Sequence, residues 1–94
     1  KYEDAGLNIV EHINKEKLFT IYPNPAKDYL TVYYKANQNY DITVYTSLGK
    51  LLATYEKAEN NFQVPVDHLA NGLYFISVTD ELGKTETLKF VKDN

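Results

Sequence analysis

Cysteine, tryptophan and methionine are all absent from this 94-residue sequence. Without cysteine the chain forms neither disulfide bonds nor thiolate metal sites, although this absence does not fix the cellular compartment. No apolar run approaches the roughly 20 residues of a membrane-spanning helix, so we expect no direct membrane insertion. The amino-terminal residues also lack the basic and apolar segments of a signal peptide. If the protein is exported, we expect that signal to lie upstream.

An excess of positive charge is missing as well, because the formal net charge is −3 and both signs are spread along the chain. Nucleic acids and anionic membrane surfaces select basic stripes, so we expect neither as a partner. Tyrosine, in contrast, is abundant with nine residues, and it favours strands. Hydrophobic residues make up 44% of the chain. Length and composition therefore predict a single small globular domain that is rich in β-structure.

The first 17 residues differ from the rest of the sequence. They are charged, they alternate poorly, and a helix over residues 7–15 would be marginal by itself in water. We therefore interpret residues 1–17 as a partly ordered linker from an upstream domain, and residues 18–94 as the folded domain.

From Leu18 onward, short segments with a period of two are separated by turn residues, which is the pattern of strands. No connection is long enough for the crossover helix that parallel strands need. We predict an all-β fold, an antiparallel immunoglobulin-like β-sandwich of about seven strands. The expected strands are residues 18–22, 29–35, 41–46, 51–56, 62–66, 73–79 and 85–92.

The alternation also assigns the two faces of each strand. In the second strand it directs Leu30, Val32 and Tyr34 inward, with Tyr29, Thr31 and Tyr33 outward. Pro65 predicts an edge strand, because proline cannot donate to a ladder on both sides. The remaining inward positions are Ile42, Val44, Tyr74, Ile76, Val78, Leu88 and Phe90.

Turn residues punctuate these strands. Pro23-Asn24-Pro25 predicts a rigid turn between the first two strands. Gly49, within the turn at residues 47–50, and Gly72 are expected to adopt backbone angles that a Cβ would strain. We also expect a turn at residues 36–39 and a four-residue hairpin loop at residues 80–83.

Four short motifs follow one another in this part of the chain. They read IYPNPA with DYLTV (21–26, 28–32), ITVY with LGK (42–45, 48–50), VPV with LANGLYF (64–66, 69–75), and TLKFVK (87–92). As an ordered set they resemble the type A C-terminal sorting domains of the Bacteroidetes type IX, or Por, secretion system. The motif and recognition positions that this resemblance marks are Tyr22, Pro23, Asn24, Pro25, Gly49, Gly72, Tyr74, Lys89, Phe90, Val91 and Lys92.

The resemblance implies a function. Such domains direct a larger cargo protein, which can itself be an enzyme, from the periplasm across the outer membrane to the cell surface or the medium. The implied partners are the translocon, its shuttle protein and a sortase-like surface peptidase that usually removes the domain. The domain itself is expected to be no enzyme and to need no cofactor.

Lys89 and Lys92 near the end of the last strand have two interpretations. One is a solvated edge strand that lysines protect from pairing with other chains. The other is a strand that the translocon reads, by strand addition or through two point charges that face an acidic partner. An exposed edge strand would also allow dimerisation.

Catalytic and metal sites find little support. His12 and His68 are the only imidazoles, and Asp67-His68 with Ser47 or Ser77 lacks a nucleophile-elbow pattern. Asp80-Glu81 lacks the spaced oxygen ligands of a calcium loop.

Two other functions are open. Outward tyrosines at Tyr29, Tyr33 and Tyr45 could form an aromatic platform of a carbohydrate-binding β-sandwich module, although strand propensity alone explains them. A structural spacer in an adhesin would be expected in tandem copies, and no internal repeat is visible.

Overall fold

The computed structural model describes residues 19–34 and 38–94, and within these ranges it contains strands and no helix. The strands are β1 (Phe19–Tyr22), β2 (Tyr29–Tyr34), β3 (Tyr40–Thr46), β4 (Leu51–Ala58), β5 (Phe62–Pro65), β6 (Gly72–Thr79) and β7 (Thr85–Lys92). The predicted all-β class is therefore confirmed. No helix long and apolar enough to cross a membrane occurs in the described ranges. The expected linker at residues 1–17, His12, and residues 36–37 of the expected turn at residues 36–39 lie outside the described residues.

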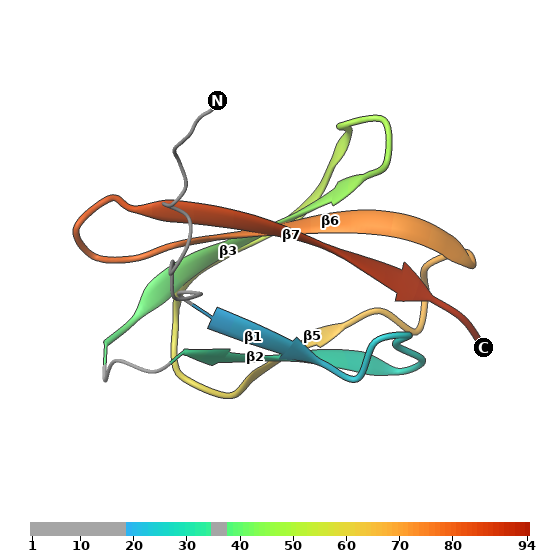
Figure 1. Ribbon diagram of the computed structural model, residues 1–94, viewed down its shortest axis with the longest axis horizontal. Helices are drawn as coiled ribbons and strands as arrows, with labels where there is room; N and C mark the ends of the chain where they lie inside the picture. Colours follow the sequence, from blue (N-terminus) through green and yellow to red (C-terminus); the bar gives the residue numbers. More distant parts are fainter. Residues whose placement is uncertain (1–18, 35–37) are drawn as a thin grey trace, which may run out of the picture.

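The strands form two layers (Figure 1). A three-stranded sheet has the order β1-β2-β5, and a four-stranded sheet has the order β4-β3-β6-β7. All five strand pairs are antiparallel. The β3–β4 hairpin projects away from the three-stranded sheet (Figure 1). This arrangement confirms the predicted β-sandwich.

The core lies between the two sheets, because alternate residues of each strand point into this space. Leu30 and Val32 of β2 face Ile42 and Ile76 of the other sheet's strands in one cluster, and all four are fully buried. The buried hydrophobic residues are Phe19, Ala26, Leu30, Val32, Tyr34, Tyr40, Ile42, Val44, Ala58, Val64, Val66, Tyr74, Ile76, Val78 and Phe90. Leu88 packs against this cluster and is half-buried. The predicted inward positions are thus confirmed.

Edges and loops follow the sequence pattern, with differences at several strand ends and in one loop. The strands β3 and β6 each begin one residue earlier than predicted, and β5 ends one residue earlier. Pro65 lies in β5 at an edge of the three-stranded sheet, as predicted. However, β4 continues to Ala58, two residues beyond its predicted end, through a ladder with two irregularities in register. The β6–β7 loop has five residues, 80–84, and a bond from the Asp80 amide to the Lys84 carbonyl closes it at 2.9 Å. The four-residue expectation was wrong because the Asp80 carboxylate also accepts the Leu82 and Lys84 amides, which organises the larger loop.

Two glycines have the backbone angles that the sequence predicted. Gly49 has a φ of 91° in the β3–β4 turn, and Gly72 has a φ of 149° at the start of β6. No atom lies within 4 Å of a Cβ built at either position, so backbone strain is what disfavours a larger residue there.

Candidate functional site

The loop that carries Pro23-Asn24-Pro25 lies against the outer edge of β7. Its Ala26 amide donates to the Val91 carbonyl at 2.7 Å, and the Ala26 carbonyl accepts the Asp93 amide at 2.9 Å. The Asn24 side chain adds a third bond, in which its Oδ1 accepts the Val91 amide at 2.9 Å. Residues 23–26, here called the PNP loop, therefore supply the hydrogen bonds that the end of this edge strand would otherwise lack. Both of its proline peptide bonds are cis.

Lys92 is fully buried, which corrects its interpretation as a solvated residue of an edge strand. It follows Phe90 on the inward-facing side of β7, and its Nζ donates to the Leu69 carbonyl at 3.2 Å and to Asn94 Oδ1 at 2.9 Å. Lysine can bury its aliphatic stem while its ammonium group reaches polar atoms at the rim. Lys92 therefore offers no accessible charge to a partner, whereas Lys89 is exposed.

Two other motif residues belong to the core of the same end of the sandwich. The rings of Tyr74 and Phe90 stack with centroids 5.5 Å apart, and the Tyr74 hydroxyl donates to the Ala70 carbonyl at 2.6 Å. The Asn94 amide donates to Asn71 Oδ1 at 3.2 Å. The first, third and fourth motifs, which are far apart in sequence, thus meet around the end of β7.

Five outward-facing residues of the second, third and fourth motifs lie together elsewhere, on the outer face of the four-stranded sheet. Tyr45 lies opposite Phe75, which lies opposite Lys89, so the three side chains form a row across β3, β6 and β7. Leu73 lies opposite Val91 in the adjoining row, and these two side chains are 42% and 39% exposed. We call Tyr45, Leu73, Phe75, Lys89 and Val91 the motif face.

Three members of the motif face were not among the residues that the sequence singled out for recognition: Tyr45, Leu73 and Phe75. The signal was available in part, because Leu73 and Phe75 alternate with the inward residues of β6. That Leu73 and Phe75 lie beside Tyr45 and Lys89 depends on the order of strands in the sheet, which alternation does not determine.

The secretion system C-terminal sorting domain model matches residues 20–93, which include all four motifs. The chain belongs to this family. The comparison confirms the resemblance noted in the sequence and spans nearly every residue of the described sandwich. No curated protein matches the sorting domain significantly.

The sorting domain is also similar in fold to part of a solved structure. That protein is PorZ, an essential bacterial surface component of the type IX secretion system of Porphyromonas gingivalis. The match has a TM-score of 0.67 and 21% identity, and it covers 81% of this chain but only 11% of PorZ. At this identity the likeness shows the fold alone.

Membership assigns the function at the level of the family. These sorting domains direct the secretion of cargo proteins by the type IX system, and such cargo is destined for the cell surface or for release. The family consists of sorting signals that are generally non-catalytic, and its role implies contact with the secretion machinery.

The hydrolytic set considered from the sequence is not assembled. His68 Nδ1 lies 3.8 Å from Asp67 Oδ1, and both side chains are about two-thirds exposed. Ser77 lies in β6, where its hydroxyl shares a 2.6 Å hydrogen bond with that of Thr87. Within the described residues, no hydrogen bond connects Ser47 or Ser77 to His68.

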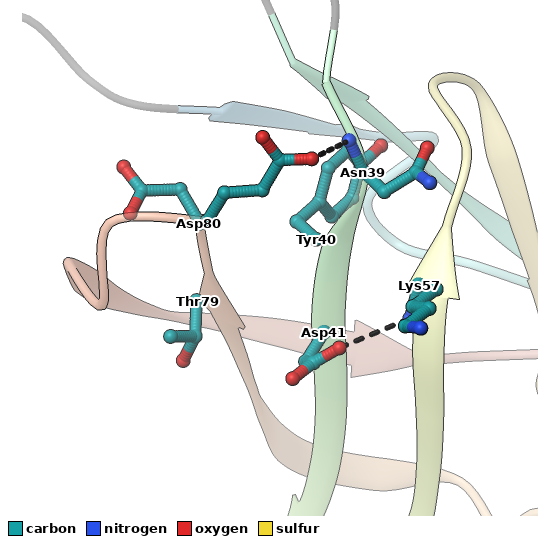
Figure 2. Close-up of a pocket in the computed structure, with 7 residues that line it drawn as sticks. Asn39, Tyr40, Asp41, Lys57, Thr79 and Asp80 are labelled. Atoms are coloured by element: carbon teal, nitrogen blue, oxygen red, sulfur yellow. Dashed lines mark hydrogen bonds between the residues drawn. The ribbon is translucent and has the colours of Figure 1, made fainter.

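The acidic residues of the β6–β7 loop line an open hollow of about 470 Å³ beside the ends of β3 and β4 (Figure 2). Carboxylates around the hollow accept backbone amides: Glu81 Oε2 accepts the Asn39 amide at 3.2 Å, and Oδ1 of Asp41 in β3 accepts the Lys57 amide of β4 at 3.0 Å. Asp80 accepts two amides of its own loop and the Tyr34 hydroxyl. The Lys84 amide above all, then the Leu82 amide and the Tyr34 hydroxyl, lower the pKa of Asp80. Among the described residues, no group of three potential ligands could hold a metal ion.

The tyrosine platform expected from the sequence is not formed as proposed. Tyr29 and Tyr33 lie on the outer face of the three-stranded sheet, whereas Tyr45 belongs to the four-stranded sheet. The expectation was wrong because period-two alternation separates inward from outward residues but does not say which sheet a strand joins.

Proposed function

We propose that the motif face is the surface by which the sorting domain is recognised by a component of the secretion machinery, either the translocon or its shuttle protein. The proposal rests on one observation: outward-facing strand residues of the second, third and fourth motifs lie side by side on one face of one sheet, where they are half-buried or exposed. The buried motif residues are explained by folding, as Tyr74, Phe90 and Lys92 illustrate. Recognition is therefore assigned to the members that folding does not require.

The chemistry of this face suggests what the partner presents. Leu73 and Val91 expose aliphatic side chains beside the aromatic residues Tyr45 and Phe75, in a chain of which 24% is charged. Lys89 is the one charged residue of the motif face. Apolar patches with a polar rim mark interaction sites. We expect the partner to present an apolar surface with a carboxylate opposite Lys89.

A second mode, in which a partner adds a strand to the edge of β7, has less room than the sequence suggested. The PNP loop already forms hydrogen bonds with the backbone of both Val91 and Asp93. A partner strand could add only along residues 85–89 unless this loop moved. The same argument directs dimerisation through an edge strand toward β4, the opposite edge of the four-stranded sheet.

The proposal extends to the rest of the sorting cycle. We propose that residues 18–94 form the sorting domain and residues 1–17 the linker to a cargo domain. The folded domain presents the motif face in the periplasm, and a sortase-like peptidase cuts near the linker at the cell surface. The PNP loop, Tyr22, Gly49 and Gly72 support the fold, because each stands in a turn or beside one.

The test is secretion of a reporter fused to this 94-residue chain in a bacterium that carries the type IX system. Phe75→Ser and Lys89→Glu change the motif face at side chains that lie on the solvent side of the sheet. We expect each variant to retain the reporter in the periplasm, with secretion falling at least about tenfold, which corresponds to about 1.4 kcal/mol of lost binding. Cell fractionation and immunoblotting measure the distribution.

Tyr33→Ser is the matched control, because it removes an exposed aromatic ring from the other sheet. It should be secreted like the native fusion. Each variant's melting temperature is measured first, so that loss of folding is recognised. Normal secretion of a folded Phe75→Ser/Lys89→Glu double variant would refute the assignment of the motif face.

A further inference from the structure

The outer face of the three-stranded sheet carries a cluster of three exposed tyrosines. Tyr29 and Tyr33 flank Thr31 along β2, and Tyr22 lies directly opposite Thr31 on β1. Directly opposite residues share one face of a sheet, and the diagonal neighbours are within reach of aromatic side chains. Tyr22, Tyr29 and Tyr33 are 48%, 49% and 41% exposed. We call them, with Thr31 and Gln63, the tyrosine face.

The burial of Thr31 shows that these rings form one surface. Alternation puts Thr31 on the solvent side of β2, yet only 9% of it is exposed. Thr31 lies in the central strand of its sheet, with Tyr22 opposite on one side and Gln63 opposite on the other. Its larger neighbours on this face therefore shield it, and they offer a ligand one nearly continuous surface.

This face is uncharged, in contrast to the rest of the molecule. The outward residues of β1, β2 and β5 are Thr20, Tyr22, Tyr29, Thr31, Tyr33, Gln63 and Pro65, and none of these seven carries a charge. Charged residues make up 24% of the whole chain. A face without charge offers no electrostatic attraction to an anionic polymer, and a neutral polymer that binds it does not have to desolvate a charged side chain.

We infer that the tyrosine face is a binding site for a neutral polysaccharide. The C–H faces of a pyranose ring pack against aromatic rings, and the hydroxyls of tyrosine and the amide of Gln63 can exchange hydrogen bonds with sugar hydroxyls. Within the described residues, no hydrogen bond engages the hydroxyls of Tyr22, Tyr29 or Tyr33. The apolar side chains that favour a protein partner, Leu73 and Val91, are on the motif face of the other sheet.

The inference is independent of the proposed sorting surface, because the two faces belong to different sheets. It would give the sorting domain a way to hold its cargo at a glycan-covered surface until the peptidase removes the domain. The two activities separate experimentally, since a change on one face leaves the other intact.

The test is affinity electrophoresis of the 94-residue chain in native gels that contain one polysaccharide. Konjac glucomannan, hydroxyethyl cellulose and soluble starch serve as neutral probes, and polygalacturonate serves as the anionic probe. We expect at least one neutral polymer to retard the native chain and polygalacturonate to leave its mobility unchanged. Tyrosine fluorescence, which no tryptophan obscures, then provides the dissociation constant for the retarding polymer.

The variant is Tyr29→Ala/Tyr33→Ala, and the matched control is Tyr45→Ala on the other sheet. The double variant should bind at least about tenfold more weakly, whereas Tyr45→Ala should bind like the native chain. Circular dichroism checks that both variants remain folded. Absence of retardation by all three neutral polymers, or equal binding by the double variant, overturns the inference. Loss of reporter secretion in the double variant, without glycan binding by the native chain, would also overturn it and indicate a protein partner.

Discussion

The ammonium group of Lys92 reaches two oxygen atoms at the rim of a core that otherwise excludes water. Its fully buried side chain connects β7 to the β5–β6 loop through the Leu69 carbonyl. The methylene groups of Lys92 contribute stability as the side chain of leucine or methionine would. The two hydrogen bonds ensure that its buried ammonium group is not left unpaired. Lys92, whose charge suggested a recognition role in the sequence, therefore serves the structure of the core.

Lys92→Ala is expected to lower the free energy of unfolding by about 2–4 kcal/mol, because it removes a buried stem and leaves a cavity. Lys92→Met keeps a stem of similar length and should cost only about 1 kcal/mol for the lost hydrogen bonds. Urea unfolding followed by circular dichroism measures both.

Lys89→Ala is the control, since Lys89 is exposed and lies three residues before Lys92 along the same strand. It should change the unfolding free energy by less than about 0.5 kcal/mol. Equal losses at the two lysines would contradict the assignment of Lys92 to the core.

At the scale of elements, β7 is an edge strand whose last residues are covered by the PNP loop. The outward amide and carbonyl of Val91 both bond to this loop, the amide to Asn24 Oδ1 and the carbonyl to the Ala26 amide. Covering an exposed edge with a loop is one way in which proteins prevent unwanted strand pairing. The remainder of the β7 edge lacks this cover from the PNP loop.

Asn24→Ala is expected to remove about 1 kcal/mol of stability and to speed hydrogen exchange at the Val91 amide, whose acceptor is lost. Exchange measured by NMR provides an internal control, because the Phe90 amide lies within the β6–β7 ladder. Its exchange should follow global stability only. Unchanged protection at Val91 would show that the Asn24 bond contributes nothing.

Elements also show how far the sequence determines the structure. Alternation predicted the buried residues Leu30, Val32 and Tyr34 correctly, because burial of one face imposes a period of two. It did not predict the contact between Asn24 and Val91, which are 67 residues apart. Nor did it separate Tyr45 from Tyr29, because the sheet that a strand joins depends on long-range pairing. Local patterns specified strands, and tertiary packing decided which surfaces they share.

At the scale of the whole molecule, two tyrosines lie where the sheets meet. Tyr34 of β2 and Tyr40 of β3 have ring centroids 5.1 Å apart, and the Tyr40 hydroxyl donates to the Val32 carbonyl of the opposite sheet at 3.2 Å. Burial, and secondarily the nearby Tyr34, raises the pKa of Tyr40 to about 12. Burial, followed by the charge of Asp80, raises the pKa of Tyr34 as well. Both tyrosine hydroxyls therefore stay neutral in the folded protein, and ionising them would destabilise it.

Alkaline solution should therefore destabilise the sandwich. Because the folded pKa of Tyr40 is above its ordinary value of about 10, its contribution is complete below that pH and is lost as pH rises toward about 12. We expect the urea midpoint to fall across this window. Tyr40→Phe should be less stable near neutrality by about 1 kcal/mol, yet its midpoint should fall less steeply. Identical slopes for both proteins would contradict a contribution from Tyr40.

The bonds between the PNP loop and β7 join segments near opposite ends of the described chain. A polypeptide truncated before Val91 cannot form them, however well its earlier strands pair. Completion of this small domain thus reports that translation has passed through its final strand. A secretion machinery that accepts only the finished sandwich would thereby reject prematurely terminated chains before they reach the cell exterior.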